Sequence, residues 1–586
     1  MNKPLVLAVA LATAGVSQAL YAEQPKPQLP AWVDESNQDA QILLKTFADL
    51  APEQAGQFGV DGLDDQASNL TPDFVQRADA ALGQDLTQLN AKLAAAADPQ
   101  LKQDLQIMIT AADNAKRDND LQTKYFLNYT NVAQLVFFGV QTLIDPQVPA
   151  ERQQAVVKRL QSYAGLLPGR PPITDQAKVL FENDLKRDPK LLGPYKGQVE
   201  QDLKDDQQYI PGIEQLLAGS KVQGWQEPWA KLKAELTDYS AWVQSDVIPR
   251  ARTDNRMPEE VYTNNLHDLG VDQDPRALIQ EAEFSFSEIQ HQLEGMAILV
   301  AKQDHMKSSD YRDVIRELKK QQLKPDTILP FYRERLKQIE AIIRKQHIVT
   351  LPQRQMMIRM GSAAETANEP APHMDTPRLI GNTGQYGSFI LPNNAGQPGG
   401  MDDDTFDAAA WTLTSHEGRP GHELQFASMI EHHTSIARAL FAFNSANVEG
   451  WALYSEAEMQ PYEPIEGQMI ALRDRLLRAA RAFLDPMVNL GMLTPDQAKE
   501  FLMREVVLSP AFAQEEANRF AFQLPGQATS YYYGYHNFLT MRGRAEVELG
   551  DKFDRQKFND FILSQGLLPP SLMQQAIDSE FIPSQK

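Results

Sequence analysis

Two histidines and a glutamate lie within seven residues of one another, at His416, Glu417 and His422. Two imidazoles on one face of a helix can hold a zinc ion, and a glutamate beside the first imidazole can accept a proton from water. These residue types are those of a metal-assisted hydrolase. We therefore expect His416 and His422 to be zinc ligands and Glu417 to be the general base.

The spacing of the two histidines is two residues longer than the four-residue step that places both on one helix face. Six residues at about 100° each leave the second side chain roughly 120° away from the first. Pro420 removes a backbone donor, and Gly421 tolerates almost any backbone angle. We expect the helix to be distorted locally at 418–421, so that His422 returns to the metal.

Two glutamates downstream complete the predicted metal site. Glu449 begins a helical segment 27 residues after His422, where a helix can fold back antiparallel, so it is the predicted third ligand. Glu456 follows two helical turns later on the same face and is predicted to orient a ligand imidazole. Alternatively both carboxylates are solvated, but Trp451 indicates a buried helix, where an unpaired carboxylate is costly.

A tyrosine and an arginine near the C-terminus are candidates for substrate contacts. Tyr531 and Arg542 are eleven residues apart, about three turns, so a continuous helix places them on one face. The Tyr531 phenol can stabilise an oxyanion, and Arg542 can bind a substrate carboxylate in bidentate fashion. The alternative is an aromatic core with a structural ion pair, and the residues alone leave both interpretations open.

One short segment, 387–393, has the composition of a β-strand and contains Phe389 and Ile390. An edge strand beside a metal site can bind an extended peptide by β-augmentation. We expect Phe389 and Ile390 to bind substrate in this way, with an ordinary buried strand as the alternative. Several further histidines are expected to lie on the surface: His267, His291, His305, His347, His373, His432 and His433.

Composition limits the possible chemistry. The 586 residues include no cysteine, so disulfides and thiolate ligands are excluded and a zinc site must use His, Asp or Glu. The formal net charge of −22 argues against nucleic acid as a partner, because phosphate binding needs basic patches.

The first 22 residues have the pattern of a secretory signal. Lys3 is followed by the apolar run Pro4–Val16 and by small residues that predict cleavage after Ala19 or Ala22. The run is too short to span a bilayer, so we expect no stable membrane insertion after cleavage. Without cysteine, lipid cannot be attached at a processed N-terminal cysteine. The expected location is the periplasm or the medium, and the alternative is an apolar helix that stays attached.

Helical periodicity dominates the chain and predicts a mostly α fold with a small β element near the metal site. Helices are predicted near 404–433, 445–460 and 465–490, among others. We divide the mature protein into an N-terminal helical lobe, 23–255, and a metal-binding catalytic lobe, 256–586.

Three motifs in order resemble those of a bacterial family of unknown function that is similar to the glutamate-ligand zinc metallopeptidases. The residues that carry this resemblance are His416-Glu417-x-x-Pro420-Gly421-His422, Glu449-Gly450-Trp451-Ala452-Leu453-Tyr454-x-Glu456 and Pro525-Gly526-Gln527-Ala528-x-x-Tyr531 with Arg542. The resemblance implies a large two-lobed helical fold with a deep cleft. It also implies zinc on His416, His422 and Glu449, with Glu417 as base. Glu423 departs from the family, in which a second histidine often follows the ligand.

The sequence therefore predicts a periplasmic zinc-dependent hydrolase of peptide bonds. One alternative keeps the metal but changes the substrate to a non-peptide or cell-wall-derived amide. Another is a non-catalytic helical periplasmic binding protein, although the presence of Glu417 argues against it. The natural substrate, endo- or exo-specificity and the oligomeric state stay open.

Overall fold

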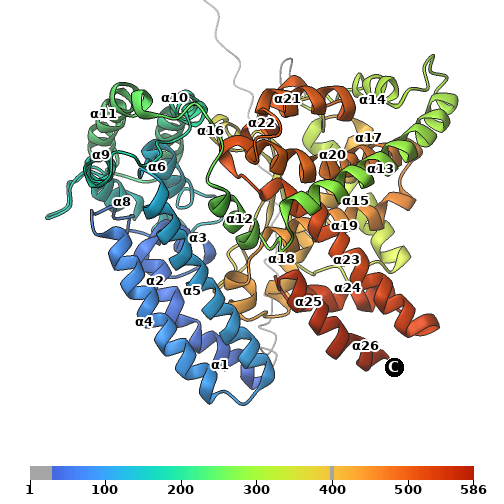
Figure 1. Ribbon diagram of the computed structural model, residues 1–586, viewed down its shortest axis with the longest axis horizontal. Helices are drawn as coiled ribbons and strands as arrows, with labels where there is room; N and C mark the ends of the chain where they lie inside the picture. Colours follow the sequence, from blue (N-terminus) through green and yellow to red (C-terminus); the bar gives the residue numbers. More distant parts are fainter. Residues whose placement is uncertain (1–28, 396–400) are drawn as a thin grey trace, which may run out of the picture.

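The computed structural model describes residues 29–395 and 401–586, and the predicted signal segment 1–22 lies outside them. Helices make up 69% and strands 3% of the structure, so the prediction of a mostly α fold with a small sheet is confirmed. The helices of the N-terminal part lie to the left in Figure 1, and most of those after residue 270 lie to the right. Within the described residues, no helix is both long and apolar enough to cross a membrane.

The N-terminal part is built from helices that cover one another in pairs. Their bounds are α1 (Ala31–Asp39), α2 (Gln41–Leu50), α3 (Pro52–Phe58), α4 (Phe74–Ala95), α5 (Pro99–Tyr125), α6 (Val132–Gln141), α7 (Ala150–Gln153), α8 (Val156–Tyr163), α9 (Ile173–Arg187), α10 (Lys196–Gly219) and α11 (Gln226–Trp242). Asp98 starts α5 by accepting hydrogen bonds from the backbone N–H groups of Gln100 and Leu101, and Pro99 takes the first helical position. The long helices α4 and α5 then pack side by side.

Four helices lead from this part toward the sheet: α12 (Glu259–Asp268), α13 (Pro275–Gln303), α14 (Tyr311–Lys319) and α15 (Ile328–Gln346). Asp274 and Pro275 start the longest of them with the same cap that begins α5. Helix α13 packs along α20, which lies at the centre of the C-terminal part.

The small sheet has three strands, β1 (Met357–Met360), β2 (His373–Asp375) and β3 (Ser388–Leu391), and α16 (Ala363–Asn368) lies between β1 and β2 in the chain. The strand order is β1-β3-β2, with β1 parallel and β2 antiparallel to β3. The strand predicted at 387–393 therefore exists but is central. Both its edges are hydrogen-bonded and Phe389 and Ile390 are buried, so their predicted role as a substrate-binding edge was wrong.

The C-terminal part contains the helices around the predicted metal site. They are α17 (Asp407–Leu413), α18 (His422–Glu431), α19 (Ser445–Met459), α20 (Ile465–Asn489), α21 (Pro495–Phe501), α22 (Pro510–Asn518), α23 (Gln527–Leu549), α24 (Arg555–Ser564), α25 (Pro570–Ala576) and α26 (Ile582–Gln585). Several turns are π-helical, including η3 (Thr414–Gly418) and η4 (Ala437–Phe441). Helices α19 and α20 are buried along almost their whole length, and α23 packs on both.

Candidate metal centre

The two predicted histidine ligands lie on different helices. Helix α17 passes into the π-helical turn η3 and ends at Gly418, Arg419 is extended with φ −122° and ψ 132°, and α18 begins at His422. The Arg419–Pro420 peptide bond is cis. The expected local distortion at 418–421 is thus a complete interruption of the helix.

Gly421 allows the chain to turn back on the helix that it has just left. A Cβ atom at Gly421 would lie 1.9 Å from the carbonyl oxygen of His416 and 2.4 Å from that of Ser415. No side chain fits at such a contact, so glycine is required here for close approach of two backbones. Arg419 holds the same turn by donating hydrogen bonds of 2.7 Å to Glu423 and 2.6 Å to Glu340.

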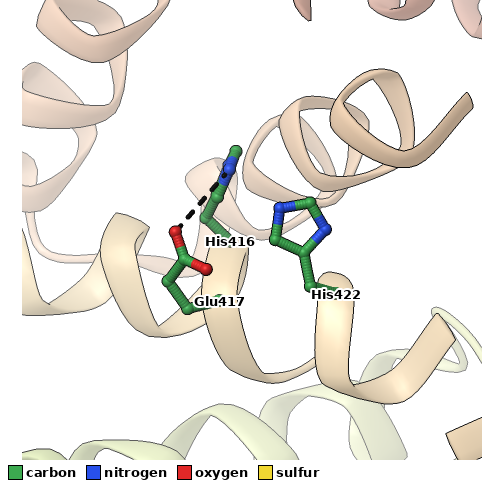
Figure 2. Close-up of side chains that lie close together, drawn as sticks. All are labelled: His416, Glu417 and His422. Carbon is green, nitrogen blue, oxygen red and sulfur yellow. Dashed lines mark ion pairs between the residues drawn. The ribbon is translucent and has the colours of Figure 1, made fainter. Parts of the chain in front are cut away.

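This turn brings the two imidazoles face to edge, with ring centroids 4.8 Å apart and an interplanar angle of 84°. Figure 2 shows both rings beside the Glu417 carboxylate. The Glu449 Oε2 atom lies 3.6 Å from Nε2 of His416 and 3.3 Å from Nε2 of His422. The structure therefore brings together all four residues predicted for the metal and its base.

The spacing of these atoms fits a metal ion better than it fits direct hydrogen bonds. Charge-assisted hydrogen bonds between nitrogen and carboxylate oxygen measure about 2.7–2.9 Å. Two donors at about 2.0–2.1 Å from zinc, at the tetrahedral angle, lie roughly 3.3–3.4 Å apart. Glu449 Oε2 is buried and has no hydrogen-bond partner among the described residues, while its Oε1 accepts a bond of 3.1 Å from Gln527. An unpaired buried oxygen that lies near two imidazole nitrogens has the arrangement expected of a metal ligand.

Glu417 and Glu449 both lie close enough to be the carboxylate ligand. Glu417 and the two histidines each offer one ligand atom, and these atoms lie within 4.8 Å of one another. However, Glu417 Oε1 is 3.9 Å from His416 Nε2, farther than Glu449 Oε2. The distances favour Glu449 as the ligand and leave Glu417 beside the ion, where a base for water would stand.

Glu456 fixes the orientation of the first imidazole. Its Oε1 lies 2.7 Å from Nδ1 of His416, and its Oε2 accepts a bond of 2.9 Å from Thr412. Arg478 donates to Glu456 at 3.2 Å. A carboxylate on Nδ1 leaves Nε2 with its lone pair toward the centre, which is the usual arrangement around metal-binding histidines.

The buried charges shift one another's pKa values. Burial raises the pKa of Glu417, so this carboxyl takes up a proton more readily than an exposed glutamate does. Burial also acts to raise the pKa of Glu449, but the contacts with both imidazoles outweigh it and hold that pKa well below its usual range. Glu449 is therefore a carboxylate at neutral pH, as a metal ligand must be.

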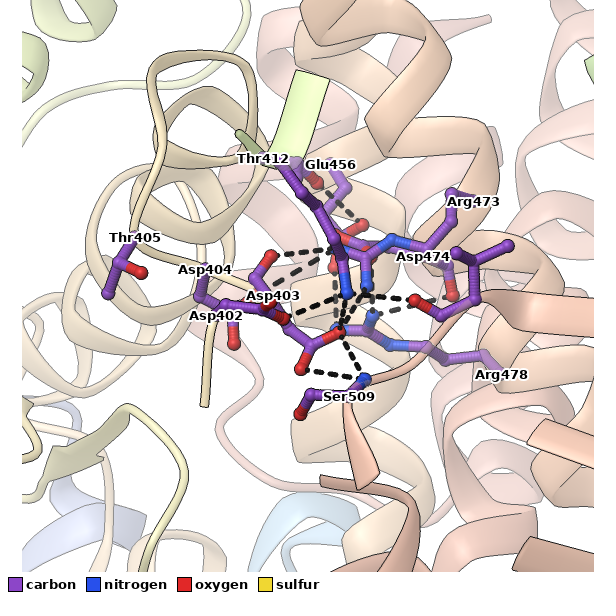
Figure 3. Close-up of polar contacts among 12 residues, drawn as sticks. Asp402, Asp403, Asp404, Thr405, Thr412, Glu456, Arg473, Asp474, Arg478 and Ser509 are labelled. Atoms are coloured by element: carbon purple, nitrogen blue, oxygen red, sulfur yellow. Dashed lines mark hydrogen bonds and ion pairs between the residues drawn. The ribbon is translucent and has the colours of Figure 1, made fainter. Parts of the chain in front are cut away.

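Figure 3 shows that Glu456 belongs to an extended network of ion pairs. Arg478 also faces Asp474 at 3.9 Å, and Nε of Arg473 forms an ion pair with Oδ1 of Asp474 at 2.8 Å. Arg473 in turn lies 3.6 Å from Asp403, which accepts a bond of 2.5 Å from Lys319. The network ties α14, α20 and the segment before α17 into one rigid support for the site.

Tyr531 lies against the centre, with its ring 6.2 Å from that of His416 and nearly parallel to it at 15°. Arg519 donates to its hydroxyl at 3.4 Å, and the Arg481 guanidinium lies 4.6 Å from the ring centroid. These arginines, together with Arg478, line a cavity of about 220 Å³ that includes the metal site. These three arginines were not predicted from the sequence. For Arg478 and Arg481 there was a signal, because they are charged residues three positions apart within the otherwise apolar run of α20.

Close packing of two helices places Glu449 and Tyr531. A Cβ atom at Gly450 would lie 2.5 Å from the backbone of Gly534, and one at Gly534 would lie 1.8 Å from the carbonyl oxygen of Ala446. Helices α19 and α23 therefore touch backbone to backbone beside both functional side chains. Only glycine permits this approach.

Arg542 lies outside the site, and its predicted role as a substrate anchor was wrong. It is absent from the described lining of the cavity and pairs with Glu458, with Glu546 at 2.8 Å and with the Tyr454 hydroxyl at 3.2 Å. Arg542 shares a helix face with Tyr531, but eleven residues at 1.5 Å each separate them by about 16 Å along the axis. The structural ion pair, the alternative interpretation, is what the structure contains.

His373 was wrongly predicted to lie on the surface. Its side chain is 14% exposed and, as the first residue of β2, lines the same cavity as Glu417. Its Nδ1 lies 3.0 Å from the carbonyl oxygen of Ala371. The other histidines predicted to be on the surface are exposed: His267, His291, His305, His347, His432 and His433.

A larger cavity of about 840 Å³ lies apart from these residues, between α14, α17 and the start of α20. It contains none of the predicted ligands in its described lining, and size alone therefore does not locate the chemistry. The smaller cavity holds the unpaired Glu449 oxygen and the shifted pKa values of Glu417 and Glu449, which make it the candidate functional site.

Two solved structures have the same overall fold. A putative lipoprotein from Colwellia psychrerythraea matches 94% of this chain and 99% of its own with a TM-score of 0.77 at 18% identity. A second one, of unknown function, from Shewanella oneidensis matches 94% of this chain and 100% of its own with a TM-score of 0.72, also at 18% identity. No curated protein matches the sequence. A family model described as "Bacterial protein of unknown function (DUF885)" matches residues 52–577, and the chain therefore belongs to this family.

Proposed function

We propose that this protein is a zinc-dependent hydrolase that cleaves amide bonds in peptides. The observation that carries the proposal is the buried Glu449 Oε2 atom, which has no hydrogen-bond partner among the described residues and lies 3.3 and 3.6 Å from two imidazole nitrogens. His416, His422 and Glu449 form a three-ligand set, which leaves the open fourth position of a catalytic zinc site. When bound, zinc supplies a Lewis acid that acidifies water and polarises the amide carbonyl.

Glu417 performs the proton transfers. It lies beside the ligands in a buried position, and burial raises the pKa of its carboxyl. Such a group accepts the proton of the attacking water and passes it to the nitrogen of the leaving amine. Because the carboxylate is acceptor-only when ionised, it also orients the water before attack.

Tyr531 and Arg519 stabilise the oxygen that becomes negative. Tyr531 lines the cavity and its hydroxyl can donate to that oxygen, while the N–H group of Arg519, at 3.4 Å, makes the phenol a stronger donor. The positive charges of Arg481 and Arg478 lie behind the ring and favour developing negative charge in the same place. Together these groups supply the preorganised electrostatics that amide hydrolysis requires.

The free edge of β2 is the place for the substrate backbone. In the order β1-β3-β2, this strand pairs among the described residues with β3 on one side only, and His373 at its start lines the metal cavity. An extended peptide can add to this edge by backbone hydrogen bonds, with its scissile amide beside the metal. This moves the proposed peptide-binding edge from β3 to β2.

Two matched substitutions test the assignment of the carboxylates. Glu417→Gln is expected to keep zinc at one ion per chain and to lower kcat for peptide hydrolysis by about 10²–10⁴-fold. Glu449→Gln is expected to weaken zinc binding by more than about a hundredfold. Loss of a residue that only hydrogen-bonds to a metal ligand costs about 10–100-fold in affinity, and this substitution removes a ligand itself. Metal analysis and a peptide-cleavage assay measure both. The proposal fails if wild-type protein binds no zinc, and the roles are reversed if the two variants exchange behaviour.

The proposed location is outside the cytoplasm. The pattern of residues 1–22 is that of an export signal, and the two structural relatives are described as putative lipoproteins. This chain has no cysteine to carry lipid, so we propose a periplasmic or secreted protein without such an anchor. Fractionation of the native host, with immunoblotting of periplasm and membranes, tests this.

A further inference from the structure

A further cavity, which we call the apolar chamber, lies between the N-terminal helices and the metal-binding region. It has a volume of about 500 Å³ and is walled by α2, α4 and α5 on one side and by α18 and η4 on the other. None of its described lining residues is charged, and most are aliphatic or aromatic, in a chain of which 23% is charged. A pocket of this size and composition is typical of a ligand-binding site.

The apolar chamber adjoins the metal cavity. Phe426, Phe443 and Thr376 line both. Phe426 follows the ligand His422 by four residues on α18, so the two side chains share one helix face about 6 Å apart along the axis. Phe443 is 55% exposed, which is unusual for a phenylalanine, and it lies at the boundary between the metal cavity and the apolar chamber.

The strand β2 begins at the metal cavity and is followed directly by a residue that lies where the two spaces meet. His373 begins the strand at the metal cavity, and Thr376, directly after its last residue, lines both cavities. A peptide paired along the free edge of β2 would carry alternate side chains toward the apolar chamber. The wall of the metal cavity that holds Arg478, Arg481 and Arg519 is charged, so the two sides of the site differ in the groups they accept.

We infer that the apolar chamber is a specificity pocket, and that the peptides hydrolysed at the metal site carry bulky apolar side chains close to the scissile amide. This inference rests on the proposed function. An apolar cavity of about 150 Å³ is already large enough for benzene. A volume of about 500 Å³ therefore admits more than one large side chain.

The test varies side-chain length in a peptide series and fills the chamber from within. For wild-type protein, kcat/KM is expected to rise roughly fourfold for each methylene added at the chamber position, from alanine through norvaline and norleucine. Ala115 is partly buried on α5 and lines the chamber, so Ala115→Phe occupies its space. This variant should lose at least tenfold on the norleucine peptide and cleave the alanine peptide at the wild-type rate. Gln106→Phe, on the exposed face of the same helix, is the matched control and should behave as wild type.

A binding measurement separates failure of this inference from failure of the proposed function. Glu417→Gln protein, which keeps the site but is not expected to turn over, is titrated calorimetrically with the alanine and norleucine peptides and with lauroyl-glycine amide. The inference holds if the norleucine peptide binds at least tenfold more tightly than the alanine peptide and adding Ala115→Phe removes the difference. It is overturned if the two peptides bind alike, if Ala115→Phe weakens both equally, or if only the acylated compound responds to Ala115→Phe.

Discussion

Helices α4 and α20 are similar in length but differ in what surrounds them. Of the 22 residues of α4 only four are buried, on one stripe that faces its neighbours. Of the 25 residues of α20 twenty are buried, and six of those are polar or charged. The first is an ordinary amphipathic helix whose stability comes from one apolar face. The second helix buries charged side chains, which costs free energy unless each of them has a hydrogen-bond or ion-pair partner.

The two helices also differ in how their buried charged residues are stabilised. Four of the five buried charged residues of α20 face opposite charges, as in the pair between Arg481 and Glu516 at 2.6 and 2.8 Å, and three of its arginines line or support the metal cavity. The fifth, Asp485, is an exception near the end of the helix, because its partners, among them the Tyr262 hydroxyl at 2.9 Å, are neutral. In the N-terminal part a buried acid such as Asp206 has only neutral hydrogen-bond partners, including Ser240 at 3.0 Å. The following predictions test this contrast between charge-paired and apolar regions.

The largest effect is expected where the two regions are joined by a buried ion pair. Arg438 on η4 donates to Asp104 on α5 at 2.8 Å, and their side chains are 4% and 0% exposed. Arg438→Met leaves Asp104 buried without its charge partner and should lower the free energy of unfolding by about 3–5 kcal/mol. Lys233→Met, which breaks the exposed pair with Glu214, should cost less than about 1 kcal/mol. Urea denaturation measures both free energies of unfolding. If the two variants lost the same free energy, the expected difference between buried and exposed ion pairs would be contradicted.

The next effect concerns the backbone contact between α19 and α23. Gly534→Ala forces these helices apart and should lower the free energy of unfolding by about 3 kcal/mol, with loss of zinc binding, because Glu449 and Tyr531 move. Gly543, on the same helix, has nothing within 4 Å of a Cβ atom. Gly543→Ala should instead stabilise by about 0.5–1 kcal/mol. Thermal unfolding with metal analysis tests the pair, and unchanged zinc binding in Gly534→Ala would contradict it.

A smaller, pH-dependent effect is expected in the N-terminal part. Burial raises the pKa of Asp206 from its ordinary value of 3.8 to about 6. Because the folded form binds the proton more tightly, the stabilisation is complete below pH about 4 and is lost as the pH rises through about 6. The loss amounts to about 3 kcal/mol at most. Asp206→Asn should flatten the dependence of unfolding free energy on pH between 4 and 8.

The opposite sign is expected for a paired acid of the C-terminal part. Burial acts to raise the pKa of Glu516, but Arg481 and Arg519 outweigh it and hold that pKa below its usual value. Its contribution to stability is therefore present above the unfolded pKa and is lost on acidification. Glu516→Gln should destabilise the protein at pH 7 and have a smaller effect at low pH. The contrast fails if Asp206→Asn and Glu516→Gln shift the pH profile in the same direction.

Local signals predicted the helices well and the long-range contacts poorly. The helices expected near 445–460 and 465–490 are α19 (Ser445–Met459) and α20 (Ile465–Asn489), because apolar periodicity is a local property. The strand at 387–393 was also found, but its central place in the sheet depends on β1 and β2, which are paired with it by contacts between distant segments. Sequence pattern gives the face of a strand, not its neighbours.

The same limit explains which site residues were found. His416, Glu417 and His422 lie close in sequence, and the Pro420-Gly421 pair showed that the helix must change between them. Arg542 was assigned from helical phase, which says which side of a helix a residue occupies but not whether its position along the axis reaches the site. His373 is contributed by a separate strand, so nothing in the sequence around it indicated that it would be partly buried beside the metal cavity.

Gly421 has a consequence for how such proteins are detected. Since the second histidine is returned to the first by a glycine that touches the backbone of the preceding helix, the number of intervening residues is set by this reversal and not by helical pitch. A pattern search that demands a fixed four-residue interval passes over the chain. A search that admits a wider interval, provided that glycine directly precedes the later histidine, would retrieve it and other chains with the same detour.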